Sequence, residues 1–197
     1  MLAWLEEHWS KSTPFIALYL GIALVLFLLP EDYALFLIWM QIVVYLLHEF
    51  EEYILPGGFV PFFNHNILGS RQDYWPLNKK MSLWINIPII YLAYPITAIL
   101  ATFYGYDFGL WLMYFSILNA LGHVGMAARL KKYNPGFVVS LLGNIPFGIY
   151  SLWYLTAHGL TSVPAHIIGL TIALICQGVV MAFGFKFLKP PVKAQQH

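Results

Sequence analysis

Long apolar segments alternate with short polar connections along this chain. Most of the segments have the roughly 17 to 25 residues that an α-helix needs to cross a bilayer. The first has 16 and can recruit residues from its flanks. The pattern predicts an all-α, polytopic transmembrane helical bundle of six spans, over 14–29, 33–55, 81–103, 109–130, 137–157 and 163–185.

The segments outside these spans are short and differ in character. Trp4, Leu5 and Trp9 predict that residues 1–13 form an interfacial N-terminal segment before the transmembrane domain of 14–185. The connection 56–80 mixes aromatic residues with Gly, Pro and polar residues. It predicts an interfacial or re-entrant loop that can cap a site. Residues 186–197 are expected to be a cytoplasmic tail.

Composition agrees with a membrane protein and narrows its partners. The chain is 60% hydrophobic and 10% charged, whereas a soluble domain is about half apolar and a quarter charged. A net charge of +1 and the absence of a basic tract indicate no nucleic-acid partner. The expected partners are therefore the lipid bilayer and a hydrophobic small molecule or lipid substrate. The single cysteine excludes a disulfide framework within the chain.

The positions of the basic residues predict the orientation of the chain in the membrane. All ten fall before the first span, between the second and third, around the fourth connection, or after the sixth. With six spans these four places share one side, and the positive-inside rule makes that side cytoplasmic. We expect a cell-membrane protein with both termini in the cytoplasm. The basic positions are Lys11, Arg71, Lys79, Lys80, Arg129, Lys131, Lys132, Lys186, Lys189 and Lys193.

The second span ends in a dense group of ionisable residues. His48, Glu49, Glu51 and Glu52 occupy four of five positions. A helix places His48, Glu51 and Glu52 on one face, because residues three and four apart are neighbours. Ionisable groups inside a membrane are costly and by default indicate a functional site.

The fourth span carries a matching polar face. Ser116, Asn119 and His123 are spaced by three and four residues. His123 lies 14 residues into its predicted span and His48 lies 15 into its own, and both spans run towards the cytoplasm. The two histidines are therefore expected at similar depth and close together. Other polar residues predicted in the same cytoplasmic half are Asn86, Asn144 and Gln177.

These residues resemble a known family. The segment from His48 to Glu52 matches the HxxEE signature of a family of small multi-pass membrane proteins named after that motif. The pair Asn119 and His123, followed by Tyr-Asn-Pro-Gly at 133–136, is similar to the downstream part of the same pattern. The resemblance covers roughly residues 40 to 145. It implies a multi-pass architecture and metal chemistry, but no substrate.

The residue types predict a divalent metal site. Imidazole nitrogen and carboxylate oxygen are ligands of catalytic zinc, which keeps one position open for water. His48 and Glu52, four residues apart on a helix, can face one ion, and His123 can complete the set. We expect zinc, with iron as the alternative. It is undecided whether His65, in the long connection, joins this site or caps its loop.

The expected chemistry is metal-assisted hydrolysis of a hydrophobic or membrane-associated substrate. An ion activates water by lowering its pKa, and Glu51 or Glu49 can act as general base. Asn119 and Asn144 can orient ligands or polarise a substrate carbonyl. The zinc-protease signature HExxH is absent, because Glu52 stands where the second histidine is required.

Two alternatives remain. The same His/Glu cluster suits a membrane transporter or a ligand- or proton-binding protein. The acidic group can also be a solvated helix end, although the helix pattern continues to position 55. Small residues in the fourth span, among them Gly122 and Gly125, are expected to permit close helix packing.

Overall fold

The computed structural model describes residues 2–182 and is helical throughout that range, apart from connections and one isolated bridge between Gln72 and Trp75. Six helices are long and apolar enough to span a membrane, which confirms the predicted six-helix bundle. The predicted tail 186–197 and the last residues of the sixth predicted span, 183–185, lie outside the described residues. The six helices are Ala3–Leu28, Tyr33–Tyr53, Lys79–Tyr104, Tyr106–Leu130, Phe137–Ala157 and Val163–Ala182.

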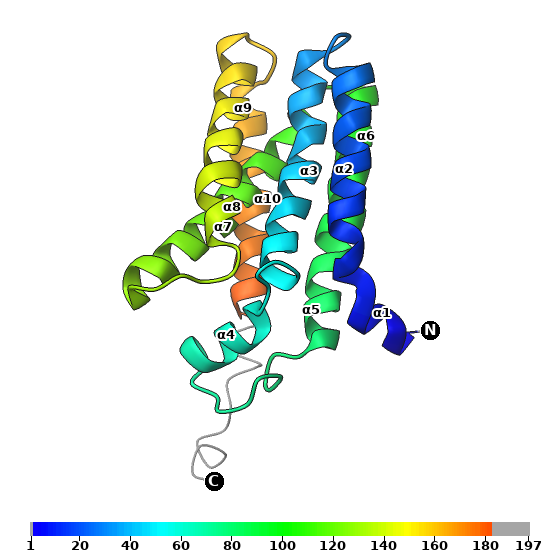
Figure 1. The fold of residues 1–197 in the computed structure, drawn as a ribbon. Helices are drawn as coiled ribbons and strands as arrows, with labels where there is room; N and C mark the ends of the chain where they lie inside the picture. Colours follow the sequence, from blue (N-terminus) through cyan, green and yellow to red (C-terminus); the bar gives the residue numbers. More distant parts are fainter. Residues whose placement is uncertain (1, 183–197) are drawn as a thin grey trace.

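Several spanning helices consist of consecutive elements (Figure 1). The first begins earlier than the sequence suggested, because α1 continues through a short 3₁₀ turn into α2. Residues 3–13 are thus helical, and their place at the interface stays a prediction. The elements are α1 (Leu2–His8), η1 (Trp9–Ser12), α2 (Thr13–Ala23), η2 (Leu24–Leu28), α3 (Tyr33–Tyr53), α4 (Phe59–Asn66), α5 (Lys79–Asn86), η3 (Ile87–Ala93), α6 (Tyr94–Tyr104), η4 (Tyr106–Gly109), α7 (Leu110–Leu130), α8 (Phe137–Val139), η5 (Ser140–Asn144), α9 (Ile145–Ala157) and α10 (Val163–Ala182).

Helix α3 is the centre of the bundle. It packs against α2, α6, α7 and α9, and α10 packs along α7. Asp32 begins α3 by accepting a hydrogen bond from the Leu35 amide at 2.9 Å, as expected for an N-cap aspartate. Burial on several sides explains why the ionisable end of α3 faces protein rather than lipid.

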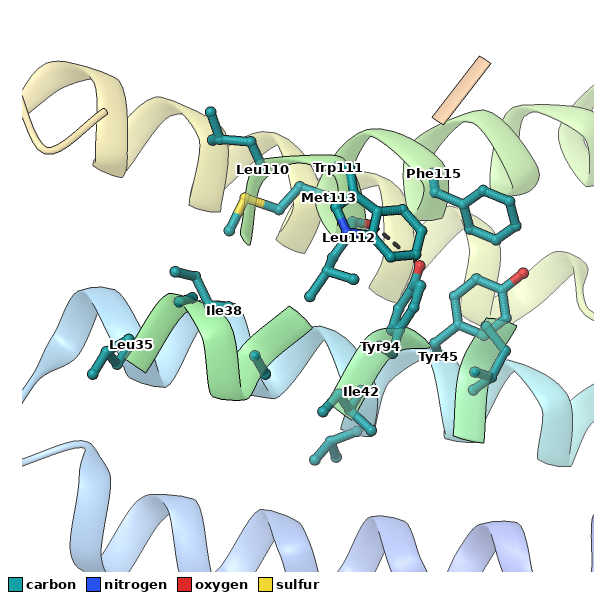
Figure 2. Packing of buried hydrophobic residues seen from close by; sticks show 14 of the residues in the cluster. Leu35, Ile38, Ile42, Tyr45, Tyr94, Leu110, Trp111, Leu112, Met113 and Phe115 are labelled. Carbon is teal, nitrogen blue, oxygen red and sulfur yellow. Dashed lines mark hydrogen bonds between the residues drawn. The ribbon is translucent and has the colours of Figure 1, made fainter. Parts of the chain in front are cut away.

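The half of the bundle away from α4 is a closed apolar core. Ile38, Leu110 and Leu112 are fully buried there, and Figure 2 shows their side chains filling the space between α3 and α7. The Tyr94 hydroxyl donates a hydrogen bond to the Leu112 carbonyl at 3.1 Å. The polar phenol is therefore satisfied without water.

Three widened, π-helical turns each lie just before a proline. They are η2, η3 and η5, which end two residues before Pro30, Pro95 and Pro146. A proline lacks the amide donor and its ring clashes with the carbonyl four residues earlier. A wider turn relieves that clash. In η5, the widened turn before Pro146, the first and last residues, Ser140 and Asn144, are both buried.

The long connection between α3 and α5 is structured. It contains the short helix α4, which lies across one end of the bundle (Figure 1). Asn64 holds the connection together, because its carboxamide donates to the carbonyls of Asp73 and Leu77 and accepts from the Leu77 amide. This end of the bundle is called the α4 end below.

Candidate metal centre and adjoining cavity

Three predicted ligands converge at the α4 end of the bundle. Glu52 Oε1 lies 3.6 Å from His48 Nε2 and 3.2 Å from His123 Nε2, and the three donor atoms all lie within 4.8 Å of one another. The rings of His48 and His123 are 4.7 Å apart between centroids, which confirms the proximity predicted from depth. Two of these separations match the roughly 3.3 Å between donors around a tetrahedral ion with bonds of about 2.0 to 2.1 Å. The His48–Glu52–His123 cluster can hold a metal ion.

In both imidazoles Nδ1 contacts a neighbouring polar group, whereas Nε2 faces the Glu52 carboxylate. His123 Nδ1 lies 2.8 Å from Asn134 Oδ1, and Asn134 Nδ2 donates to the His123 carbonyl at 3.0 Å. The second bond fixes the orientation of the carboxamide, so Nδ1 of His123 is the donor. His48 Nδ1 lies 3.3 Å from the Ser140 hydroxyl. Such outer partners set the tautomer of metal-binding histidines.

Gly136 covers the cluster from the fourth connection. A Cβ at this position would lie 2.8 Å from Cε1 of both His48 and His123 and 2.9 Å from Glu52 Cγ. Its φ of +94° also favours glycine. The backbone therefore approaches the three side chains too closely for a Cβ, and the connection forms one wall of the cluster.

Glu51 points away from the cluster towards the start of the fifth spanning helix. Its carboxylate accepts hydrogen bonds from the Tyr133 hydroxyl at 2.8 Å and from the amides of Val138 and Val139 at 2.9 and 2.6 Å. Burial and this hydrogen bond raise the pKa of Tyr133, which keeps the phenol protonated as a donor. A carboxylate at a helix N-terminus satisfies amides that have no helical partner. Glu51 thus connects α3 to the fourth connection.

Glu49, the other acid predicted as a general base, is fully buried. Neither of its carboxylate oxygens has a hydrogen-bond partner among the described residues. It does not line the cavity described below. It lies within electrostatic reach of Tyr91 and Tyr94, and so on the side of the third spanning helix.

The two predicted asparagines differ in position. Asn119 Nδ2 lies 3.2 Å from His48 Nε2, beside the cluster. Asn144 Nδ2 donates to the Ser116 hydroxyl at 2.9 Å and links the fourth and fifth spanning helices. Its Oδ1 has no partner in the part of the chain that the structure describes.

His65 lies outside the cluster. Its Nδ1 contacts the Ser70 carbonyl at 2.9 Å and its Nε2 contacts Asp73 Oδ1 at 2.7 Å. The Asp73 carboxylate, and next the Ser70 carbonyl, raise the pKa of His65. The structure thus answers the question left by the sequence, because His65 closes its own loop.

A cavity of about 410 Å³ adjoins the cluster. Glu52, His123 and Asn119 reach its wall, and its other polar residues include Asn86, Gln177 and Arg129. Volumes of 300 to 1,000 Å³ are typical of small-molecule sites. The apolar wall is formed mainly by Tyr45, Tyr53, Phe59, Phe63, Ile67, Leu77, Ile85, Ile89, Ile90, Phe115, Met126, Leu130, Val180 and Met181.

Two glycines of α7 line this cavity. A Cβ added at Gly122 or Gly125 would meet no atom within 4 Å. The expectation that these two residues permit close helix packing is therefore wrong. At these two positions α7 offers no side chain to the cavity. Close packing occurs instead at Gly109 and Gly148, where an added Cβ would lie 2.8 Å from a neighbouring side chain.

Three residues of the site were not assigned a role from the sequence. Asn134 and Gly136 belong to a motif that predicts a turn, and Ser140 lies in an apolar run. The sequence does indicate that the turn at 134–136 lies near His123, because it follows the end of the helix that carries this histidine. Residue spacing alone does not show that the Asn134 carboxamide folds back to the His123 imidazole.

Comparison with known proteins agrees with this geometry. A family model described as "Protein of unknown function with HXXEE motif" matches residues 39–151, which is more than half of the chain and contains all three cluster residues. Neither curated proteins nor solved structures gave a match. The chain therefore belongs to the HXXEE-motif family, whose function is unknown.

Proposed function

We propose that this protein is a metal-dependent membrane hydrolase that acts on a hydrophobic substrate. The observation that carries the proposal is the His48–Glu52–His123 cluster beside an apolar cavity, whose wall includes Glu52 and His123. A site for both an ion and an apolar ligand is what such a reaction requires. With the α4 end in the cytoplasm, as the basic residues predict, substrate would arrive from the inner leaflet.

In this proposal His48, Glu52 and His123 hold the ion, zinc by preference. A bound ion supplies a Lewis acid and lowers the pKa of a water molecule towards 7. Asn119 lines the cavity and lies beside His48, so its carboxamide can orient a substrate carbonyl. Asn144 does not line the cavity and donates to the Ser116 hydroxyl, which suits a positioning role.

Glu49 and Glu51 remain the two candidates for the general base. The hydrogen bonds of their carboxylates distinguish the two candidates. Glu51 has three hydrogen-bond donors on its carboxylate, which suits a structural role. Glu49 has no hydrogen-bond partner among the described residues and lies three residues from Glu52. We therefore favour Glu49, which would need a water or a small movement to reach the cavity.

Elemental analysis of the purified, detergent-solubilised protein tests the ion directly. We expect about one equivalent of zinc or iron, which His48→Ala and His123→Ala both lose. His158→Ala is the matched control, because this exposed histidine bonds only its own helix backbone in the described structure. Absence of a bound metal after supplementation with zinc and with iron would contradict the proposal.

Hydrolysis needs a separate assay. The metal-loaded protein is tested against esters and amides of long-chain acids, with Glu52→Gln as the inactive reference. Turnover that follows metal content across the wild type and both histidine variants supports the proposal. A protein that holds its ion and hydrolyses none of these compounds is not the predicted hydrolase.

The second candidate is a transporter or proton-binding protein. The observation that favours it is the buried, unpartnered carboxyl of Glu49, since intramembrane acids commonly relay protons. Against it, Ile38, Leu110 and Leu112 close the other half of the bundle. Proton or cation flux into vesicles that contain the protein would favour this candidate, and Glu49→Gln should abolish that flux.

A further inference from the structure

We infer that the cavity binds a single-chain acyl ester with a phosphate-type headgroup, placing the headgroup at Arg129 and the acyl chain along α7. The hydrolysis of such a ligand rests on the proposed function. Its binding does not, because it depends on the cavity and on Arg129 alone.

The lining of the cavity follows α7 over several turns. Along α7 its lining extends from Phe115 to Leu130, which is about 22 Å at 1.5 Å per residue. A volume of about 410 Å³ spread over that length has room for one chain but not for the two chains of a bilayer phospholipid. Phe115, Ile89 and Ile90 belong to the apolar lining, which suits a hydrocarbon tail.

The walls leave space for the ligand. Gly122 and Gly125 present only backbone hydrogens to the cavity, and a Cβ at either would meet nothing within 4 Å. A helix that packed tightly here would have no reason to leave this volume open. These two positions thus offer a direct way to fill the cavity by substitution.

Arg129 provides the charge at the other end. It is exposed, it lines the cavity, and no carboxylate of the described residues lies within 4 Å of it. A guanidinium recognises phosphate and carboxylate oxygens through paired hydrogen bonds. Lys131 and Lys132 follow it in sequence and add positive charge nearby.

The distance between the two polar regions indicates how the ligand is built. Arg129 is six residues beyond His123, about 9 Å along α7. A three-carbon polyol between a phosphate and an acyl ester bridges such a gap and places the ester carbonyl beside Glu52 and His123. Hydrolysis there breaks the acyl C–O bond. The hydroxyl of water joins the acyl carbon and its proton goes to the alcohol oxygen, which gives a fatty acid and a polyol phosphate.

Equilibrium binding to the purified protein in an uncharged detergent tests this inference. The probes are 1-palmitoyl lysophosphatidic acid and monopalmitoylglycerol, which differ only in the phosphate, together with inorganic phosphate. We expect the phosphate-bearing lipid to bind roughly tenfold or more tightly than the neutral one, as hydrogen bonds to charged groups allow. Inorganic phosphate should compete poorly, because it lacks the chain.

Matched variants distinguish recognition of the phosphate headgroup from binding of the acyl chain. Arg129→Gln should abolish the preference for phosphate, while the same change at Arg71, the only other arginine, should not. Gly122→Leu and Gly125→Leu should weaken both lipids. Gly178→Leu is their control, since this glycine of α10 also has open space but does not line the cavity.

Several results would overturn the inference. These are equal affinity for the two lipids, a preference that survives Arg129→Gln, lipid binding that is unaffected by leucine at 122 and 125, and inorganic phosphate that competes as well as the lipid. All binding is repeated with Glu52→Gln, which cannot complete the ion site. Selective binding without any bound metal would uphold the inference and reject the hydrolase, whereas a bound metal without selective binding would do the reverse.

Discussion

Asn134 and His123 hold each other by two hydrogen bonds, from Nδ1 to Oδ1 at 2.8 Å and from Nδ2 to the backbone carbonyl at 3.0 Å. Asn134→Ala is expected to lower metal affinity about 10- to 100-fold, as the loss of an outer partner typically does. Asn134→Asp keeps the acceptor and should recover most of the affinity. Titration with a competing chelator measures both. Unchanged affinity in Asn134→Ala would show that the turn does not orient His123.

Gly136→Ala should abolish metal binding, because its methyl group would lie 2.8 Å from both imidazoles. Gly159→Ala is the control for backbone strain, since Gly159 also has a positive φ but open space around its Cβ position. The control should lose only the roughly 1–2 kcal/mol of a left-handed residue. Metal content and thermal unfolding, measured on both variants, separate the clash from the strain. A metal-loaded Gly136→Ala protein would contradict the close approach.

Glu51→Gln should lower Tm, because it weakens charge-assisted bonds to the amides of Val138 and Val139, each of a kind that contributes about 1.5–3 kcal/mol. Metal content should change little. Glu31→Gln, at an exposed turn, is the matched control. The opposite pattern, with an unchanged Tm and lost turnover, would identify Glu51 as the base instead.

The contact between His65 and Asp73 predicts a pH dependence in the long connection. The pKa of His65 is raised in the folded protein, so the pair stabilises the loop fully below the unfolded histidine pKa of about 6.5. That contribution is lost as the pH rises through the raised value. An NMR titration of labelled histidine should place the His65 midpoint above that of Asp73→Asn. Equal midpoints would refute the charge pairing.

Orientation can be tested by labelling. In a Cys176→Ala background, an external membrane-impermeant maleimide should label Glu31→Cys, in the first connection, but not Arg71→Cys, in the second. The positive-inside rule predicts this pattern. The reverse labelling pattern would place the α4 end outside the cell.

The sequence predicted the spanning helices and the proximity of the cluster residues for one reason. In a membrane helix, apolar length and the spacing of polar residues are strong constraints, and depth counted from each span was enough to bring His48 and His123 together. The same spacing also predicted Glu51 on the face of α3 that carries His48. In the structure the Glu51 carboxylate instead accepts hydrogen bonds from the amides of Val138 and Val139, at the start of the fifth spanning helix.

The cavity could not be predicted in this way. A glycine in a transmembrane helix marks either close packing or open space, and only the neighbouring helices decide which. Gly109 and Gly148 face side chains, whereas Gly122 and Gly125 face the cavity. The position of Asn134 depends likewise on the path of a turn, which residue spacing does not specify.

The family match covers one part of the site and leaves another part out. All three cluster residues and the turn that covers them fall within residues 39–151, but Gln177, Val180 and Met181 of α10, which close the cavity, do not. The polar cluster therefore belongs to the part of the chain that defines the family, whereas α10, which completes the cavity wall, lies outside that part.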